Sequence, residues 1–160
     1  MTERLDLWRL RIGLLAFWSL YFAIVALSNL TDLLRGVGVL AADWHWISGN
    51  LAFMASATGK FGVPAWANPL LLAGVIAWQG LAAVLFWRAA RDGGNDSLGP
   101  PFMVGIALWA VFVLLDELLL IFETGAEATH LRLLIAQLVT LVFIRLDRAL
   151  ERSTPPLGSG

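Results

Sequence analysis

Four apolar runs, each close to the length that crosses a lipid bilayer, place the strongest constraint on the fold of this chain. A transmembrane helix needs about 20 consecutive apolar residues, because each residue advances about 1.5 Å along the helix axis. The runs predict an all-α fold, a four-helix transmembrane bundle that forms a single domain over residues 1–152. The predicted spans cover residues 12–30, 69–87, 102–123 and 131–146.

The composition leaves too few polar side chains to cover a water-facing surface. Hydrophobic residues make up 59% of the 160 residues and charged residues 14%, whereas soluble proteins have about 25% charged residues. Lipid is therefore expected to cover much of the molecule. The net charge of -1 argues against a nucleic-acid partner, and the absence of cysteine excludes disulfides and thiolate metal sites.

The connections between the runs differ in length and composition. Residues 31–67 form the longest, and glycines and prolines interrupt it, but its apolar residues predict an outer loop that is partly embedded in the membrane. Its tryptophans suit the bilayer interface. The short turn 124–130 predicts that the third and fourth spans are antiparallel neighbours, and residues 153–160 are predicted to be a disordered tail.

Basic residues predict the orientation, because cytoplasmic loops of membrane proteins carry an excess of Lys and Arg. With four spans, both termini and the 88–101 connection lie on the same side, which has all but three of the 11 basic residues. We therefore expect a multi-pass protein of the cytoplasmic membrane, with its N- and C-termini in the cytoplasm. The three on the outer side are Arg35, Lys60 and Arg132.

Two adjacent carboxylates, Asp116 and Glu117, interrupt the third run. Asp116 lies roughly 20 Å along the predicted span, about two turns before its outer end. An ionised carboxylate at the centre of a span costs about 2.5–3.5 kcal/mol on insertion scales, so it is expected to have a polar partner. Neighbours on a helix are turned by about 100°. One carboxylate is therefore expected to face the bundle interior, and the other a neighbouring helix, a cavity or a partner protein.

Helical spacing places Asp116 on a stripe of residues along one face of the third span. The stripe consists of Gly105, Trp109, Phe112, Asp116, Glu123 and Glu127, with Trp109 interpreted as a packing residue. Glu123, Glu127 and His130 also have the i, i+4, i+7 spacing of metal ligands on one helix. Gly125 and the turn interrupt that helix, so they are weak candidates, and no metal site or other cofactor is predicted.

Polar residues at matching depths predict that every span contributes to the outer half of the bundle, whereas the inner half has almost none. Two interpretations are open: a polar pocket that opens to the outside, or interhelical hydrogen bonds that hold the helices in register. The set consists of Asn29, Asp32, Gln79, Asp116, Glu117, Arg132 and Gln137.

Several short motifs resemble those of an uncharacterised bacterial family of predicted small four-pass integral membrane proteins, a domain of unknown function. The run Ser28-Asn29-Leu30-Thr31-Asp32 resembles the family's Asn-Asn-Leu-Thr-Asp, and Trp78-Gln79-Gly80-Leu81 resembles its Trp-Glu-x-Leu-Thr-Ala. Glu117 with Ile121-Phe122-Glu123-Thr124 is similar to its Gly-Gly-Glu and Met-Trp-Gln-Ser pieces, and Arg132 matches an Arg that opens the last span.

The resemblance implies four spans and a membrane location, without a known activity. It points to Asn29, Asp32, Gln79, Glu117 and Arg132, and it favours Glu117 with Arg132 as the centre of a site. The first loop departs from the family, since its Met-Asp-Thr-Thr-Phe piece is missing and only Asn50, Phe53 and Met54 correspond to it.

Three functions follow from these features. The first is a binding or accessory protein that holds a small molecule, a lipid or a quinone head group, or that docks on a larger membrane complex or on further copies of itself. The second is a small proton-coupled transporter that uses Glu117, which the apolar inner half disfavours. The third is a membrane enzyme, which is disfavoured because the sequence has no recognisable pair of nucleophile and base.

Overall fold

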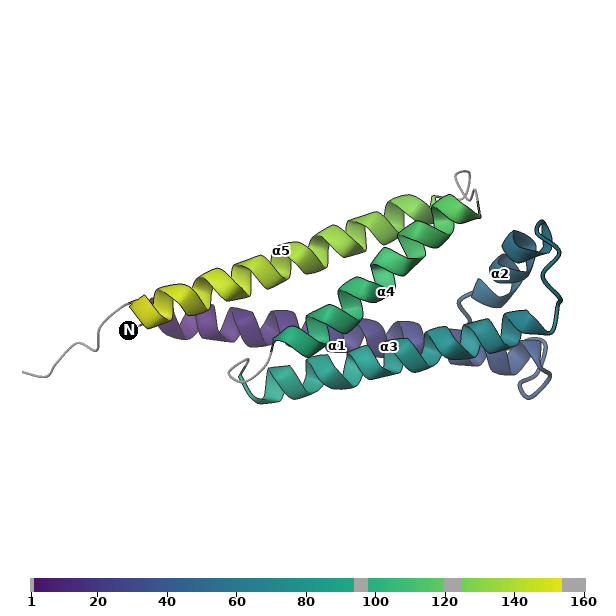
Figure 1. Cartoon of the computed structure of the whole chain (residues 1–160). Helices are drawn as coiled ribbons and strands as arrows, with labels where there is room; N and C mark the ends of the chain where they lie inside the picture. The colour runs from purple at the N-terminus through teal and green to yellow at the C-terminus, as the bar shows by residue number, and fades with distance from the viewer. Residues whose placement is uncertain (1, 94–97, 120–124, 154–160) are drawn as a thin grey trace, which may run out of the picture.

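The computed structural model describes residues 2–93, 98–119 and 125–153, and within them the chain is all α-helical, with no strand. The predicted all-α class is therefore confirmed, and each predicted span overlaps a described helix (Figure 1). The helices are α1 (Thr2–Gly36), α2 (Asn50–Gly59), α3 (Ala67–Arg91), α4 (Gly99–Leu118) and α5 (Ala126–Ser153).

Three of the helices are long and apolar enough to cross a membrane: the Leu7–Gly36 part of α1, α3 and α4. The predicted count of four helices is wrong, because α2 lies within the 31–67 connection. The segment Asn50–Gly59 has no proline, and polar groups from outside it satisfy its first amides. Ser48 Oγ accepts the Asn50 N–H at 3.1 Å, and Asp32 Oδ2 accepts the Leu51 N–H at 2.8 Å. A pattern within the segment could not reveal a helix that depends on α1.

The boundary of α4 also differs from the prediction. The described helix ends at Leu118, where the Leu119 N–H donates to the Leu115 carbonyl at 2.8 Å. Residues 120–124, which complete the predicted third span, lie outside the described residues, as does the predicted tail from residue 154 onward. Asp116 and Glu117 therefore lie in the last turn of α4, rather than two turns before its end.

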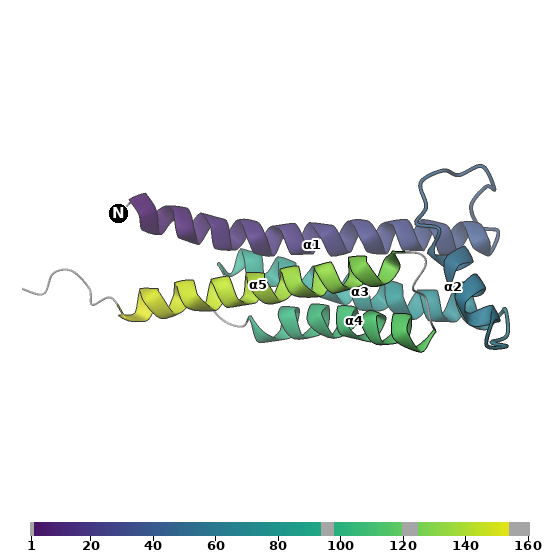
Figure 2. The ribbon, with the colours of Figure 1, turned by 90° about the horizontal axis from the view of Figure 1, so that it is seen from above.

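The long helices form two antiparallel pairs, α1 with α3 and α4 with α5, as predicted for the last two. The N-terminal end of α1 and the C-terminal end of α5 lie at one end of the molecule, which we call the terminus end (Figures 1 and 2). At the other end, the α2 end, α2 packs on α1 and α3. From the terminus end to the α2 end, the α4–α5 pair diverges from the α1–α3 pair (Figure 1).

Aromatic rings join three of the helices at the centre of the bundle. Phe22 of α1 stacks with Phe86 of α3 and with Trp109 of α4, with ring centroids 5.8 Å and 5.6 Å apart. All three side chains are buried. This contact fixes α4 against the α1–α3 pair and leaves its more distant turns free to diverge.

Buried polar contacts lie toward the terminus end, where almost none were expected. The Arg11 guanidinium is 3.3 Å from the Asp147 carboxylate, and both side chains are buried. Trp18 Nε1 donates to Thr140 Oγ1 at 3.2 Å. Arg11 and Asp147 were missed because the apolar runs stop at their first charged residues, whereas α1 and α5 continue past these residues and bury them. Trp18 and Thr140 lie within the predicted spans, and their pairing is a long-range contact that the apolar pattern does not predict.

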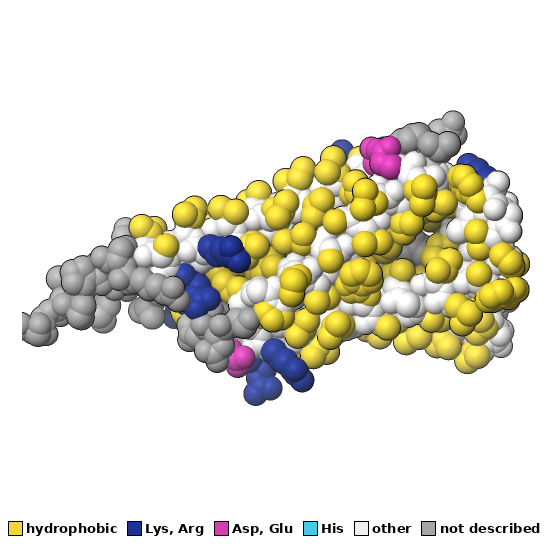
Figure 3. Space-filling view, in the orientation of Figure 1, with side chains coloured by type: hydrophobic (Ala, Val, Ile, Leu, Met, Phe, Trp, Pro, Cys, Tyr) yellow, Lys and Arg dark blue, Asp and Glu magenta, His cyan; other side chains and the backbone are white. Residues whose placement is uncertain are grey.

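Large apolar side chains cover much of the outer surface of the helices (Figure 3). Leu20, Leu70, Met103, Leu114 and Val139 each have more than 60% of their surface exposed. Soluble monomers rarely expose apolar surface so continuously. The surface is therefore suited to contact with lipid.

Candidate functional site

The predicted polar residues separate into two groups. One group, the α1–α3 network, joins α1, α2 and α3 near the α2 end. The other, the α4–α5 cluster, lies between α4 and α5. The network consists of Asn29, Asp32, Ser48, Asn50 and Gln79, and the cluster consists of Trp109, Asp116, His130 and Gln137.

Asn29 is the central residue of the α1–α3 network and is fully buried. Its Nδ2 donates to Gln79 Oε1 at 2.8 Å, and its Oδ1 accepts from Asn50 Nδ2 at 2.7 Å. A single amide thus connects α1 to both α2 and α3. Asn29 and Gln79 come together as the sequence predicts.

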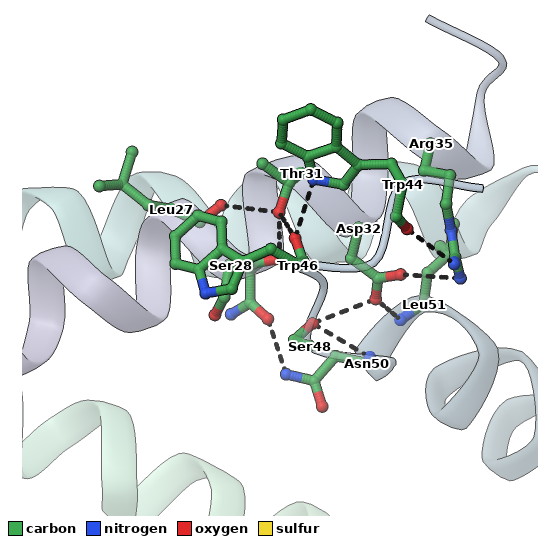
Figure 4. A network of polar contacts seen from close by, with 11 residues as sticks. Leu27, Ser28, Thr31, Asp32, Arg35, Trp44, Trp46, Ser48, Asn50 and Leu51 are labelled. Atoms are coloured by element: carbon green, nitrogen blue, oxygen red, sulfur yellow. Dashed lines mark hydrogen bonds and ion pairs between the residues drawn. The ribbon is translucent and has the colours of Figure 1, made fainter. Parts of the chain in front are cut away.

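Asp32, also buried, uses its carboxylate to hold the start of α2 (Figure 4). Oδ2 accepts the Leu51 N–H at 2.8 Å and the Ser48 hydroxyl at 3.1 Å. A carboxylate at a helix N-terminus satisfies free amides and interacts favourably with the helix dipole. Arg35 lies 4.0 Å from the other oxygen, Oδ1, and balances its charge.

The loop before α2 is fixed to the same part of α1 (Figure 4). The Thr31 hydroxyl donates to the Trp46 carbonyl at 2.6 Å, and Trp44 Nε1 donates to the same oxygen at 3.1 Å. Every fully buried side-chain nitrogen and oxygen of the α1–α3 network has a partner among the described residues. The network therefore acts as a clamp that joins α1, α2 and α3.

In the α4–α5 cluster, Asp116 is buried and its Oδ2 lies 2.6 Å from His130 Nδ1. The imidazole also stacks with Trp109, at 6.1 Å between ring centroids, and lies 4.9 Å from the Phe112 ring. The carboxylate and the aromatic rings fix the orientation of the imidazole. Three members of the predicted stripe are thus brought together around a histidine of the next helix.

Two buried groups of the cluster have no hydrogen-bond partner among the described residues: the Gln137 side-chain amide and Trp109 Nε1. Gln137 has no exposed surface and Trp109 has 3%. By contrast, the indole N–H groups of Trp18 and Trp78 donate to oxygens at 3.2 Å and 3.0 Å. Leaving a buried polar group unpaired costs about 1–3 kcal/mol, so a bound molecule would remove a substantial cost here.

Gly105 provides the space for the Gln137 amide. A Cβ atom on Gly105 would be 2.6 Å from Gln137 Nε2 and 2.7 Å from Oε1, closer than real side-chain contacts. Trp109 follows Gly105 by one turn on the same face of α4. The amide and the indole N–H therefore lie along one stripe of the helix.

Glu117 and Arg132, the favoured pair, are both exposed and belong to neither group. The two carboxylates do face different surfaces, but Asp116 is the one that faces the interior. The resemblance and the estimated depth favoured Glu117, and neither specifies the rotation of α4. The sequence predicts His130 only as a weak metal ligand. Its position in the first turns of α5, directly after the turn that follows α4, also places it opposite the end of α4.

No group of three or more His, Cys, Asp or Glu side chains that could hold a metal ion occurs in the part of the chain that the structure describes. Of the weak candidates, Glu123 lies outside the described residues, Glu127 is half-buried, and His130 is paired with Asp116. Thr140, Ser48 and Asn50 are polar partners that the sequence analysis did not identify. Their short side chains resemble those of ordinary helix and loop residues.

Comparisons with known proteins identify no relative from which a function could be inferred, so the inference rests on the geometry of the site. No family model, no curated protein and no solved structure matches this chain.

Proposed function

We propose that this chain is a four-pass integral protein of the bacterial inner membrane that binds a small molecule at the α4–α5 cluster. The apolar length of α1, α3 and α4, together with the apolar run within α5, supports four spans. The predominance of basic residues near the termini supports a cytoplasmic location for both of them. In this orientation the α2 end faces outward.

The observation that carries the binding role is the pair of buried, unpartnered groups, Trp109 Nε1 and the Gln137 amide. In the hydrocarbon region, water is scarce and a missing hydrogen bond is costly. A ligand that accepts from Trp109 and exchanges hydrogen bonds with Gln137 offsets that cost. The α1–α3 network has the separate role of holding α2 and the helices in place.

The other functions gain less support. Glu117 is exposed on α4, and this position gives less support to a proton-coupled transporter that uses Glu117. The Asp116–His130 pair orients an imidazole, but its other described contacts are with the Trp109 and Phe112 rings, so they add no hydroxyl or thiol to the pair. Docking on a larger complex or on further copies remains a prediction that this geometry neither requires nor opposes.

The test is native mass spectrometry of the full chain released from mild detergent. We expect the wild-type protein to retain a small molecule, Gln137→Leu to lose it, and Glu117→Gln to retain it. Glu117→Gln is a matched control because it changes an exposed polar residue on the same helix pair. Retention of the same molecule by Gln137→Leu, or no bound molecule in any variant, would contradict the proposal.

A further inference from the structure

The α4–α5 cluster is completed by a third helix. The hydrogen bond between Trp18 and Thr140 fixes the register of α1 against α5. One turn from it toward the α2 end, Tyr21 of α1 and Gln137 of α5 reach the same level. The Tyr21 ring also lies 6.2 Å from that of Trp109. The register and this ring contact therefore bring Tyr21, Trp109 and Gln137 near one another from three helices.

The unpartnered groups determine what a ligand must offer. An indole N–H only donates, while a glutamine amide both donates and accepts. A carbonyl oxygen can accept from Trp109 Nε1 and from Gln137 Nε2. The ligand therefore needs at least one such acceptor.

The charges around the cluster favour an uncharged ligand. Its titratable side chains are Asp116 and His130, which are paired with each other at 2.6 Å. Arg132, the basic residue next along α5, is exposed. A phosphate or carboxylate head group would thus lose its hydration here without gaining a cation from the cluster, which is unfavourable.

The surrounding side chains favour a flat head group. Phe22 and His130 both stack with Trp109, at interplanar angles of 18° and 23°. Phe112 and Tyr21 add two further rings beside them. Aromatic walls of this kind pack well against planar rings.

Access to the cluster is easier from the α2 end than from the terminus end. At the terminus end, the Arg11–Asp147 and Trp18–Thr140 contacts join α1 to α5. Toward the α2 end the helix pairs diverge (Figure 1), and the surface is hollowed between the end of α4 and α2, with apolar side chains beside the hollow (Figure 3). This side of the bundle is where lipid is expected, so the apolar tail of a ligand can extend toward it.

From this geometry we infer that the α4–α5 cluster binds a neutral, lipid-soluble ring carbonyl compound, of the chemical class of alkylated quinones, with Trp109 and Gln137 as donors to its carbonyl oxygen. The inference rests on the proposed binding function and specifies its ligand class. Binding is the whole of the inference, and no electron transfer is assigned to the chain.

The test uses three probes with the same tail: decyl-benzoquinone, decylbenzene and decyl phosphate. Each is titrated into the full chain in lipid nanodiscs, and affinity is measured calorimetrically. We expect decyl-benzoquinone to bind at least about tenfold more tightly than either of the others, since one buried hydrogen bond corresponds to about that factor. Gln137→Leu and Trp109→Phe should each weaken it about tenfold, and Glu117→Gln should not.

Equal binding of decylbenzene, or tighter binding of decyl phosphate, would overturn the ligand class. So would unchanged quinone affinity in both Gln137→Leu and Trp109→Phe. Trp109→Phe keeps an aromatic ring, which guards against a folding defect in one variant. If the quinone fails to bind but a Gln137-dependent molecule is still retained in native mass spectrometry, the binding function stands and only the ring carbonyl inference fails.

Discussion

The α1–α3 network and the α4–α5 cluster each contain a buried carboxylate and a buried side-chain amide, yet their hydrogen bonding differs. In the network, Asn29 and Asp32 both have several partners, at distances between 2.7 and 3.1 Å. In the cluster, Gln137 and the Trp109 indole have none among the described residues. Buried polar residues in a membrane bundle can thus stabilise the fold or be available to bind a ligand. The number of hydrogen-bond partners that each residue has distinguishes these two roles.

This difference has consequences for mutation. Removing a group that already has partners leaves those partners buried and unpaired, which costs stability. Replacing an unpaired group with an apolar one removes a cost, so stability should rise while binding is lost. Substitutions in the α1–α3 network and substitutions of the unpaired groups in the α4–α5 cluster should therefore have opposite effects on stability.

The largest effect is expected for Asp32→Leu. The substitution leaves the Leu51 N–H and the Ser48 hydroxyl without their acceptor and Arg35 without its nearby carboxylate. The expected loss is about 3 kcal/mol, since hydrogen bonds to charged groups contribute about 1.5–3 kcal/mol each. It is measured by thermal unfolding in detergent and by protease cleavage between residues 37 and 66.

Asp43→Asn is the matched control, since Asp43 is exposed in the connection between α1 and α2. Asp32→Asn should lose less than Asp32→Leu, because its amide oxygen can still accept the Leu51 N–H. A stability of Asp32→Leu equal to that of the wild type would show that the clamp does not hold α2.

A smaller loss is expected for Asn29→Ala. Its amide makes one hydrogen bond to Gln79 and one to Asn50. Interhelical hydrogen bonds in membranes contribute about 0.6–2 kcal/mol each, so the expected loss is about 2 kcal/mol. A double-mutant cycle with Gln79→Ala should give a coupling energy near 1 kcal/mol. Additive effects would show that the Asn29–Gln79 contact contributes nothing of its own.

Gln137→Leu should change stability in the other direction. It replaces an unpartnered, fully buried amide with an apolar side chain of similar volume. We expect a gain of about 1 kcal/mol in the ligand-free protein, at the low end of the cost of an unpaired polar group. Thermal unfolding after exhaustive delipidation measures it. A clear loss of stability would mean that Gln137, like Asn29, belongs to the structural framework.

These contrasts also define how much of the molecule could be predicted from its sequence. The helices follow from apolar runs, and the separation of Asp116 from Glu117 follows from helical geometry. Which of the two carboxylates faces the interior does not follow from helical geometry. It depends on how α4 is rotated against α5 and on His130, which lies 14 residues after Asp116. The contact between Asp116 and His130 joins two helices, and the periodicity within one helix does not predict it.

The contact of Asp32 with α2 and the buried Arg11–Asp147 pair could not be predicted from the sequence for a related reason. Helix α2 needs a carboxylate that lies 19 residues before Leu51. The Arg11–Asp147 pair spans 136 residues and lies where hydropathy alone would end both helices. Asn29, Asp32 and Gln79 could be identified as a set because they are polar residues within or beside apolar runs, where each requires a partner.

The smallest effect on stability, and the most specific one on binding, is expected for Gly105→Ala. The added methyl group would lie 2.6 Å from Gln137 Nε2, so the end of this side chain must move. Alanine favours a helix over glycine by about 1 kcal/mol, and this offsets the cost of the movement, so the net change should stay within about 0.5 kcal/mol. The displaced amide can no longer meet the same acceptor as Trp109 Nε1, and ligand affinity should fall about tenfold. Gly74→Ala is the matched control, because a Cβ atom at Gly74 would meet nothing within 4 Å. If Gly105→Ala bound ligand as well as Gly74→Ala does, the position of the Gln137 amide would be irrelevant to binding, and the contrast between the two groups would lose its functional meaning.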